Sequence, residues 1–298
     1  MRVAITGASG LIGNRLSSFL SENGHEVLAL VRRNARSTDE VSWDPAGGHI
    51  DVDRLEGIDA VVHLAGENIA GGRWTTARKA AIRDSRVHGT RTLCDGLRRL
   101  DRRPRVLVSA SAIGFYGDRG DEALTEESAS GDGFLADVCR RWEDAAAPAS
   151  AAGIRVVTLR IGVVLTSEGG ALKTMLPPFR LGIGGVLGAG DQYMSWIAIE
   201  DLVRAIYHCI DNEALRGPVN AVAPSPVTNQ ELTRALGRVL HRPTFLPVPA
   251  FALRLLVGEM ADALLLASTR VEPVRLRAAG FEFLHPRLEE ALSAELAR

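Results

Sequence analysis

The sequence of 298 residues predicts an α/β fold in which helices cover both faces of a largely parallel β-sheet. One observation behind this prediction is that short apolar runs, rich in β-branched residues, alternate with longer amphipathic stretches through the first half of the chain. Another is a glycine-rich turn that joins the first apolar run to the first amphipathic stretch. Apolar residues make up 46% of the chain, which is enough to bury a sizeable core.

The order of apolar and amphipathic segments places the individual elements. We expect strands at residues 3–5, 27–31, 60–64, 106–108 and 156–159. Helices are expected between them at 11–22, 76–100 and 134–147. Because strands that alternate with helices pair in parallel, these segments predict one doubly wound sheet.

The alternation loosens after about residue 166. Pro177 and Pro178 are expected to break any helix around them, and helices resume at 200–211 and 229–240. A glycine-rich segment at 182–196 is expected to form a mobile loop over a cleft, where Gln192 and Trp196 either contact a ligand or pack. The tail is expected to be helical at 251–266 and 289–296, with its apolar run at 263–267 packed on the main body.

Composition and charge exclude several classes of partner. Lys and Arg total 35 and Asp and Glu 36, so the net charge of −1 provides no general attraction to nucleic acid or to an anionic membrane. A cluster of arginines at 98–105 is expected to be a solvated helix end. No apolar run approaches the roughly 20 residues of a membrane span, and glycine appears too early for a signal peptide. Three widely spaced cysteines fit buried thiols and no metal site, so we expect a cytoplasmic protein.

A glycine motif follows the first expected strand directly. Gly7, Gly10 and Gly13 have the spacing G-x-x-G-x-x-G and open the first amphipathic helix, which begins with Leu11 and Ile12. In this context glycines make a tight turn, let the backbone approach a pyrophosphate and allow close helix packing, while the helix N-terminus provides free N–H groups. The motif predicts a Rossmann-type dinucleotide-binding fold; the alternative is a structural turn that binds nothing.

The end of the second expected strand indicates which dinucleotide fits. A carboxylate about 20 residues past the last glycine would bind a ribose 2′-hydroxyl and favour NAD. This chain has Arg32 and Arg33 there, and two guanidinium groups suit a 2′-phosphate by charge and by bidentate geometry. We therefore expect NADP(H) as the cofactor; the alternative is two solvated arginines at a strand end.

These features divide the chain into three regions. We expect an NADP-binding Rossmann domain at 1–165, to which later segments can return strands. A cleft loop and substrate-side region follows at 166–246. The remainder, 247–298, is expected to be a smaller, mainly helical C-terminal region that covers the substrate or acts as a lid.

The sequence also resembles a known superfamily. The glycine spacing, followed by DAVVHLA at 59–65 in a D-x-V-x-H-x-A pattern, resembles the extended short-chain dehydrogenases/reductases. Further motifs narrow the resemblance to atypical members called epimerase-family, or nucleoside-diphosphate-sugar-epimerase-like, proteins, which carry a C-terminal domain of unknown function, here at about 247–292. Those motifs are WDP at 43–45, GEN at 66–68, RW at 73–74, SR at 85–86, FLA at 134–136, WE at 142–143, LPPF at 176–179 and SWI at 195–197.

The resemblance implies which residues would hold NADP(H). Those implied for the pyrophosphate are Gly7, Gly10, Leu11, Ile12 and Gly13, with Arg32 and Arg33 at the adenosine phosphate. Those implied for the adenine and ribose path are Leu64, Ala65 and Gly66, with Arg86 as a further contact from the long helix. Gly162 and Val163 would approach the nicotinamide end.

Two residues beside this path have competing interpretations. Glu67 either faces the cofactor or substrate from a loop at the carboxyl end of a strand, or only caps and hydrogen-bonds the loop backbone. His63 lies on an apolar strand, where a core histidine with satisfied hydrogen bonds is the better interpretation.

The usual catalytic pair of the superfamily is missing. Working members use a serine or threonine together with tyrosine and lysine in a Y-x-x-x-K pattern. With the WE motif at 142–143 as the anchor, the matching helix has Leu135 and Cys139 at the tyrosine and lysine positions, and no such pair occurs elsewhere in the chain. The candidates that remain for acid–base chemistry are Tyr116, Ser109 and Glu67, with Asp137 and Cys139 if they face the cleft.

Two functions are consistent with these observations. One is an NADP(H)-dependent oxidoreductase or epimerase with an atypical active site, acting on a small or nucleotide-linked substrate. The other is a non-catalytic NADP(H)-sensing protein that regulates a partner through its C-terminal domain. The missing tyrosine and lysine favour the second, whereas the cleft loop and the intact cofactor motif favour the first. Two long helices beside the sheet are compatible with a homodimer.

Overall fold

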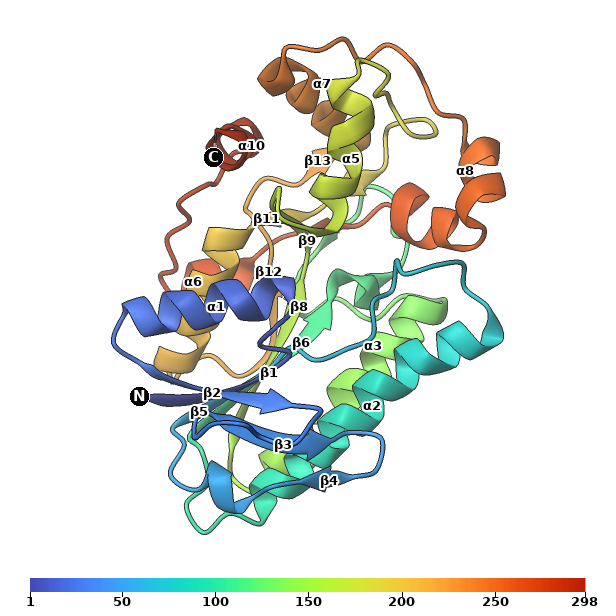
Figure 1. Ribbon diagram of the computed structural model, residues 1–298. Coiled ribbons are helices and arrows are strands. Elements are labelled where there is room, and N and C mark those ends of the chain that lie inside the picture. The colour runs from blue at the N-terminus through green and yellow to red at the C-terminus, as the bar shows by residue number, and fades with distance from the viewer. Residues whose placement is uncertain (298) are drawn as a thin grey trace.

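The computed structural model describes residues 1–297 and contains one large sheet, three two-stranded sheets and the helices around them (Figure 1). The strands are β1 (Arg2–Thr6), β2 (Glu26–Val31), β3 (Glu40–Asp44), β4 (His49–Ile50), β5 (Ala60–His63), β6 (Val106–Ala112), β7 (Ala123–Leu124), β8 (Arg155–Ile161), β9 (Val163–Leu165), β10 (Tyr193–Met194), β11 (Trp196–Ala198), β12 (Gly217–Ala221), β13 (Val227–Thr228) and β14 (Arg270–Val271). The helices are α1 (Leu11–Glu22), α2 (Thr76–Arg98), α3 (Phe134–Asp144), α4 (Ala147–Ala151), α5 (Gly170–Arg180), α6 (Ile199–Asp211), α7 (Asn229–Leu240), α8 (Ala250–Val257), α9 (Val274–Ala278) and α10 (Leu288–Leu296). Short helical segments are η1 (Asp53–Leu55), η2 (Ile113–Tyr116) and the π-helical η3 (Ala261–Leu266).

The large sheet confirms the doubly wound α/β prediction. Its strand order is β12-β8-β6-β5-β1-β2-β3-β4, and every pair except β3–β4 is parallel. The chain starts at β1, continues outward through β2 and β3, and then crosses to β5 on the other side of β1. The strand order therefore reverses between β1 and β5, and open α/β sheets bind ligands at the carboxyl ends of the strands at such a reversal.

Helices cover both faces because the strands are apolar on both sides. Val3 and Ile5 of β1 belong to the core cluster that contains residues of α1 and α6. Ala4, between them, belongs to the cluster that contains Leu93 and Leu97 of α2. Figure 1 shows α1 and α6 on one face of the sheet, α2 and α3 on the other, and most of the C-terminal elements gathered beyond one end of the sheet.

The sequence pattern did not predict three strands of the sheet, β3, the two-residue β4 and β12. β3 contains only five residues and begins and ends with the carboxylates Glu40 and Asp44. β12 contains Pro218, which has no N–H for a strand ladder. It is tolerated because β12 is the edge strand and pairs only with β8.

The expectation that Pro177 and Pro178 break the chain's helical course is wrong. Both lie inside α5, in its C-terminal half. Each proline removes one helical hydrogen bond, but packing offsets that loss. Leu172, Leu176 and Phe179 are buried in a cluster with residues of α7 and α10, so the apolar side of α5 holds the helix together.

The C-terminal tail is helical in two pieces rather than one over 251–266. Helix α8 ends at Gly258, whose φ of +66° lies in the region that glycine favours, and the π-helical η3 follows. The segment 182–196 is fastened to this tail, since the N–H of Gly188 donates to the carbonyl of Val248 at 2.9 Å. Trp196 is fully buried and its Nε1 donates to the carbonyl of Ser225 at 3.0 Å, so it packs.

Three further observations concern the composition of the folded chain. Cys94, Cys139 and Cys209 are buried free thiols, as expected. Within residues 1–297 no helix is long and apolar enough to cross a membrane. The same residues place no group of three or more histidine, cysteine or carboxylate side chains where they could hold a metal ion.

Candidate cofactor site and cavity

The glycine turn has the geometry of a phosphate-binding loop. Gly7 has φ of +71°, and the N–H of Gly10 donates to its carbonyl at 2.9 Å. A Cβ on Gly13 would lie 2.1 Å from the carbonyl oxygen of Gly7, so only glycine lets α1 start this close to β1. Helix α1 begins at Leu11 with no side-chain cap and no acidic residue in its first turn. Its N-terminal N–H groups therefore remain available to an anion.

A buried histidine connects this turn to α2. His63 Nδ1 lies 2.7 Å from Thr6 Oγ1, and its Nε2 lies 3.0 Å from Thr90 Oγ1. Thr6 Oγ1 also accepts from the N–H groups of Leu64 and Ala65, both at 3.1 Å, so its proton goes to His63 Nδ1. Burial lowers the pKa of His63 to about 4, and the ring is neutral. The interpretation of His63 as a satisfied core histidine is confirmed.

The two arginines after β2 differ in their surroundings. Arg33 forms a bidentate ion pair with Glu40, with Nη1 2.7 Å from Oε2, and this bond holds the pKa of Glu40 at about 2. Arg32 is exposed, and its side chain has no hydrogen bond or ion pair to any other residue that the structure describes. Arg32 is therefore the guanidinium that is free to meet a ligand at this strand end.

Arg86 lies under the loop that follows β5. Its Nη1 donates to the carbonyls of Glu67 at 3.0 Å and Ile82 at 3.1 Å. The guanidinium carbon lies 4.9 Å from the ring centroid of Trp142. A Cβ on Gly66 would lie 3.1 Å from that carbon, so the glycine leaves room for the arginine below the loop.

The Glu67 carboxylate belongs to an ion pair on the loop. Its Oε1 accepts from Arg78 Nη1 at 2.7 Å, and the Glu67 side chain is 38% exposed. The Glu67 N–H donates to Ser85 Oγ at 3.1 Å. These contacts favour the interpretation in which Glu67 holds the loop.

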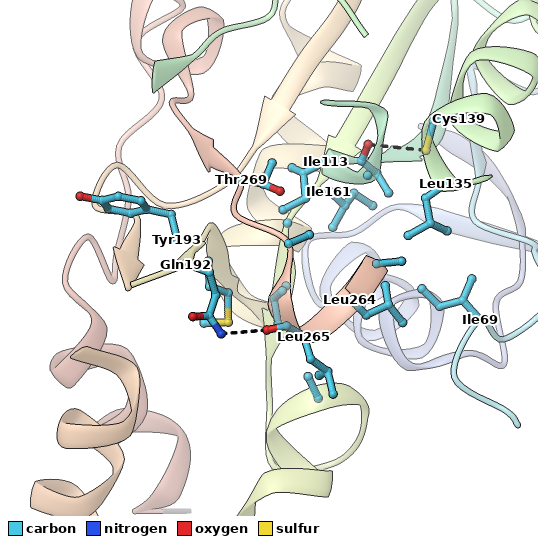
Figure 2. Close-up of a pocket in the computed structure, with 18 of the residues that line it drawn as sticks. Ile69, Ile113, Leu135, Cys139, Ile161, Gln192, Tyr193, Leu264, Leu265 and Thr269 are labelled. Atoms are coloured by element: carbon cyan, nitrogen blue, oxygen red, sulfur yellow. Dashed lines mark hydrogen bonds between the residues drawn. The ribbon is translucent and has the colours of Figure 1, made fainter. Parts of the chain in front are cut away.

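A cavity of about 310 Å³ lies between the carboxyl ends of β6 and β8 and the C-terminal elements (Figure 2). Of the residues implied for the cofactor, Arg86, Gly162 and Val163 line it. A Cβ on Gly162 would lie 2.7 Å from the carbonyl oxygen of Ser195, so this glycine also permits a close approach of two chain segments. The glycine turn and Arg32 lie outside the cavity wall, further along the same edge of the sheet.

Tyr116 and Ser109 are buried and do not line this cavity. The Tyr116 hydroxyl donates to Asn220 Oδ1 at 2.7 Å and accepts from Arg160 Nη1 at 3.0 Å. Arg160 in turn forms a buried ion pair with Glu143, with both nitrogen–oxygen distances 2.9 Å. Burial raises the pKa of Tyr116, which opposes formation of a tyrosinate. The structure therefore places this phenol in a structural network.

The helix positions that lack tyrosine and lysine do face the cavity. Leu135 and Cys139 of α3 both line it, and Cys139 Sγ donates to the carbonyl of Ala112 at 3.7 Å (Figure 2). Burial raises the pKa of Cys139 to about 11, so the thiol is protonated at neutral pH. Asp137 is absent from the cavity wall and pairs with Arg141 at 2.8 Å.

Sequence reasoning missed the C-terminal wall of the cavity. Six apolar residues from distant segments converge there: Met175, Leu187, Met194, Leu232, Leu264 and Leu265. The signal available was the apolar run at 263–267, which does pack on the main body. Its role as a cavity wall depends on contacts with segments some 70 to 90 residues earlier in the chain, such as the bond from Gln192 Nε2 to the carbonyl of Leu265 at 3.0 Å.

Two family models together match most of the chain. Residues 3–221 match the NAD dependent epimerase/dehydratase family. Residues 248–295 match a domain of unknown function, DUF1731. The boundary between the two matches follows β12, the edge strand that completes the sheet.

Curated relatives and solved structures are similar to this chain over nearly all of its length. An epimerase family protein of Mycobacterium tuberculosis is 46% identical, covering 99% of this chain and 98% of that protein. The crystal structure of human epimerase family protein SDR39U1 with NADPH has a TM-score of 0.92 at 33% identity, covering 100% of this chain and 99% of that one. A structure named as a nucleoside-diphosphate sugar epimerase from Corynebacterium glutamicum has a TM-score of 0.81 at 41% identity, covering 99% and 58%. This chain therefore belongs to the NAD dependent epimerase/dehydratase family, among the SDR39U1-like epimerase family proteins that carry a C-terminal DUF1731 domain.

Proposed function

We propose that this chain binds NADP(H) and acts as an oxidoreductase on a small substrate. The observation that carries the proposal is Arg32, an exposed guanidinium directly after β2, at the position where a carboxylate would favour NAD. The glycine turn beside it has no room for a Cβ on Gly13 and leaves the N-terminus of α1 free, which fits a pyrophosphate. The human relative crystallised with NADPH supports the same cofactor.

The residues would hold the dinucleotide along the carboxyl edge of the sheet. Arg32 would bind the 2′-phosphate, the glycine turn the pyrophosphate, and Gly162 and Val163 the nicotinamide end at the cavity. When bound, the cofactor supplies or accepts a hydride. The chain itself would contribute a largely apolar cavity, with the protonated thiol of Cys139 in its wall. Since no tyrosine–lysine pair lines the cavity, neither the usual hydride transfer nor the usual epimerisation of the superfamily can use that pair here, and we propose an oxidation or reduction in which it takes no part.

One observation favours a second candidate function, a non-catalytic NADP(H)-binding protein. Four of the five acid–base candidates lie outside the cavity wall: Tyr116, Ser109, Glu67 and Asp137. The cavity presents Leu135 and a thiol of raised pKa where working relatives of the superfamily have tyrosine and lysine. A protein that only senses NADP(H) would need the cofactor site and no acid–base group.

The cofactor proposal is tested by titrating the protein with NADPH and with NADH and following nucleotide fluorescence. Arg32→Ala is expected to weaken NADPH binding about tenfold or more and to leave NADH binding within about twofold, because it removes a charge-assisted contact to the 2′-phosphate alone. Arg33→Ala is the matched control, and its effect is expected to be smaller because Arg33 is already paired with Glu40. Equal affinity for the two nucleotides in the unmodified protein would contradict the proposal.

Turnover separates the two candidate functions. NADPH oxidation is followed by absorbance against a panel of ketones, aldehydes and quinones. Consumption of NADPH that depends on one of these compounds supports the oxidoreductase. Tight NADPH binding with no consumption across the panel supports the non-catalytic candidate.

A further inference from the structure

We infer that the substrate of the proposed activity is a compact, uncharged and largely apolar molecule, and not a nucleotide-linked sugar. The inference rests on the proposed function, because it assumes that the nicotinamide end enters the cavity beside Gly162 and Val163. It concerns the opposite wall of the cavity, which the C-terminal half of the chain builds. That wall decides what can lie next to the nicotinamide.

The opposite wall is apolar and comes from five separate segments. Met175 lies on α5, Leu187 on the following loop, Met194 on β10 and Leu232 on α7. Leu264 and its neighbour Leu265 extend from η3, and Figure 2 shows both beside the cavity, with Ile69 and Leu135 on the side of Leu264. Five independent segments supply side chains of one chemical kind, which indicates an apolar ligand surface.

Most of the polar side chains in the wall use at least one polar atom within the chain. Gln192 Nε2 donates to the carbonyls of Leu187 and Leu265, both at 3.0 Å. Asn229 Oδ1 accepts from the N–H of Leu187 at 2.8 Å. Thr269 Oγ1 donates to the carbonyl of Gly117 at 3.2 Å. The Tyr193 hydroxyl points away from the cavity in Figure 2. The amide groups left over, Gln192 Oε1 and Asn229 Nδ2, are fewer than the hydroxyls of a sugar that would lose their water.

The wall contains no cation that a diphosphate could use. Arg86 is the one charged residue among those that line the cavity. Its guanidinium donates to two backbone carbonyls and lies over the Trp142 ring, on the side of the cavity formed by α2 and α3. A diphosphate against the opposite wall would lose its hydration without gaining an ion pair, which strongly disfavours binding.

The cavity is also small, and one segment of its wall is anchored on both sides. Its volume of about 310 Å³ must hold the nicotinamide end as well as the substrate. The segment that carries Leu264 is fastened on both sides: Lys79 pairs with Glu259 before it, and the N–H of Ser268 donates to Asp118 Oδ1 at 3.1 Å after it. With a nicotinamide in place, this volume favours a compact molecule over one that must also place a nucleotide in the cavity.

The test uses acetophenone as an apolar carbonyl probe and UDP-glucose as the alternative. Both are titrated into the full-length protein saturated with NADP⁺, and binding is followed by ligand-observed saturation-transfer NMR. Saturation with NADP⁺ keeps the UDP moiety out of the cofactor site. We expect acetophenone to bind and UDP-glucose to show no binding at the same concentrations.

Variants locate the bound probe. Leu264→Gln is expected to weaken acetophenone binding about fivefold, because it places an amide against the apolar probe. Leu256→Gln, on the 68% exposed Leu256 of α8, is the matched control and is expected to leave binding within about twofold. If Leu264→Gln fails to fold, Met175→Gln on α5, in the same wall, replaces it, with the 74% exposed Leu181→Gln as its control.

Two results would overturn the inference while the cofactor proposal stands: UDP-glucose binding more tightly than acetophenone to the NADP⁺-saturated protein, or acetophenone binding that neither cavity variant weakens. Absence of NADPH binding in the nucleotide titration would instead overturn the proposed function, and the inference with it. The NADPH titration therefore distinguishes the two failures.

Discussion

A neutral imidazole between two threonines shows how single residues shape the proposed cofactor site. Thr6 donates to His63 Nδ1, so His63 Nε2–H donates to Thr90 Oγ1, and Thr90 donates to the carbonyl of Arg86 at 2.7 Å. The chain of bonds runs from the end of β1 to the arginine under the loop after β5. It needs the unprotonated ring, because a protonated Nδ1 would face the hydroxyl of Thr6 with no acceptor left for it.

The His63 pKa leads to a prediction about acid stability. The folded pKa of about 4 lies below the ordinary value of 6.5, so the unfolded chain takes up this proton first as the pH falls. The contribution of the neutral His63 to the free energy of unfolding is fully present above pH 6.5. It is lost progressively as the pH falls to about 4, which lowers the free energy of unfolding by up to about 3 kcal/mol. Urea unfolding at pH 7.5 and pH 5 checks it. His63→Gln should be less sensitive to pH over this range, whereas the exposed His88→Gln should behave like the unmodified protein.

A second prediction at this scale concerns the glycine turn. Gly13→Ala places a methyl group 2.1 Å from the Gly7 carbonyl, so either the turn or the start of α1 must move. We expect a lower Tm and a loss of NADPH binding. Gly89→Ala in α2 is the control, since its Cβ would meet nothing closer than 3.7 Å and alanine favours helices. Unchanged NADPH affinity in Gly13→Ala would show that the turn does not hold the nucleotide.

At the scale of an element, α5 depends on packing rather than on helix propensity. It contains two prolines and follows Gly169 with no side-chain cap. Its apolar side lies in the cluster shared with α7 and α10. Helices of this kind form because tertiary contacts stabilise them, which local patterns do not report.

A matched pair of leucines tests this explanation. Leu176→Ala removes a side chain that is 3% exposed and should lower the free energy of unfolding by about 2–5 kcal/mol. Leu181→Ala, at the C-cap of the same helix, removes a side chain that is 74% exposed and should cost less than about 0.5 kcal/mol. Denaturant unfolding measures both. Equal costs would show that propensity, and not burial, holds the helix.

At the scale of the whole molecule, the C-terminal region is joined to the sheet by buried hydrogen bonds. Asp201, fully buried in the first turn of α6, accepts from the N–H groups of Leu284 at 2.7 Å and His285 at 2.9 Å. Ser195 Oγ donates to the carbonyl of Thr269 at 2.8 Å, and β14 pairs with β7. The region that carries part of the cavity wall is thus held by the same structure that carries the cofactor site.

This connection predicts one cooperative unfolding transition, in which tryptophan fluorescence and far-UV circular dichroism coincide. Asp201→Ala leaves two backbone N–H groups without their acceptor and should lower the free energy of unfolding by about 3 kcal/mol. Glu289→Ala is the control: it removes an exposed ion pair with Arg238 and should cost less than about 1 kcal/mol. Two separate transitions would show that the C-terminal region folds independently.

Part of this architecture was predictable from local signals. The bounds of α1 and α7 were predicted to the residue, because an amphipathic period and clear boundary residues coincide there. Strand β12 was not, since a proline-containing run reads as a strand only when its place at the sheet edge is known. The helix through Pro177 and Pro178 was wrongly excluded because the packing that stabilises it involves distant segments, which a local pattern does not show.

The sequence by itself determined the five central strands and the helices between them, the glycine turn and the position of the arginines after β2, because each has a signal in residues close together in the chain. Only the tertiary structure decided that the Arg33 side chain is paired with Glu40, while the Arg32 side chain has no hydrogen bond or ion pair with another described residue. It also decided that Tyr116 belongs to a buried network and that η3 completes an apolar cavity. These features depend on contacts between distant segments, and a side chain's partners across the fold, unlike its local pattern, are set by how the elements pack.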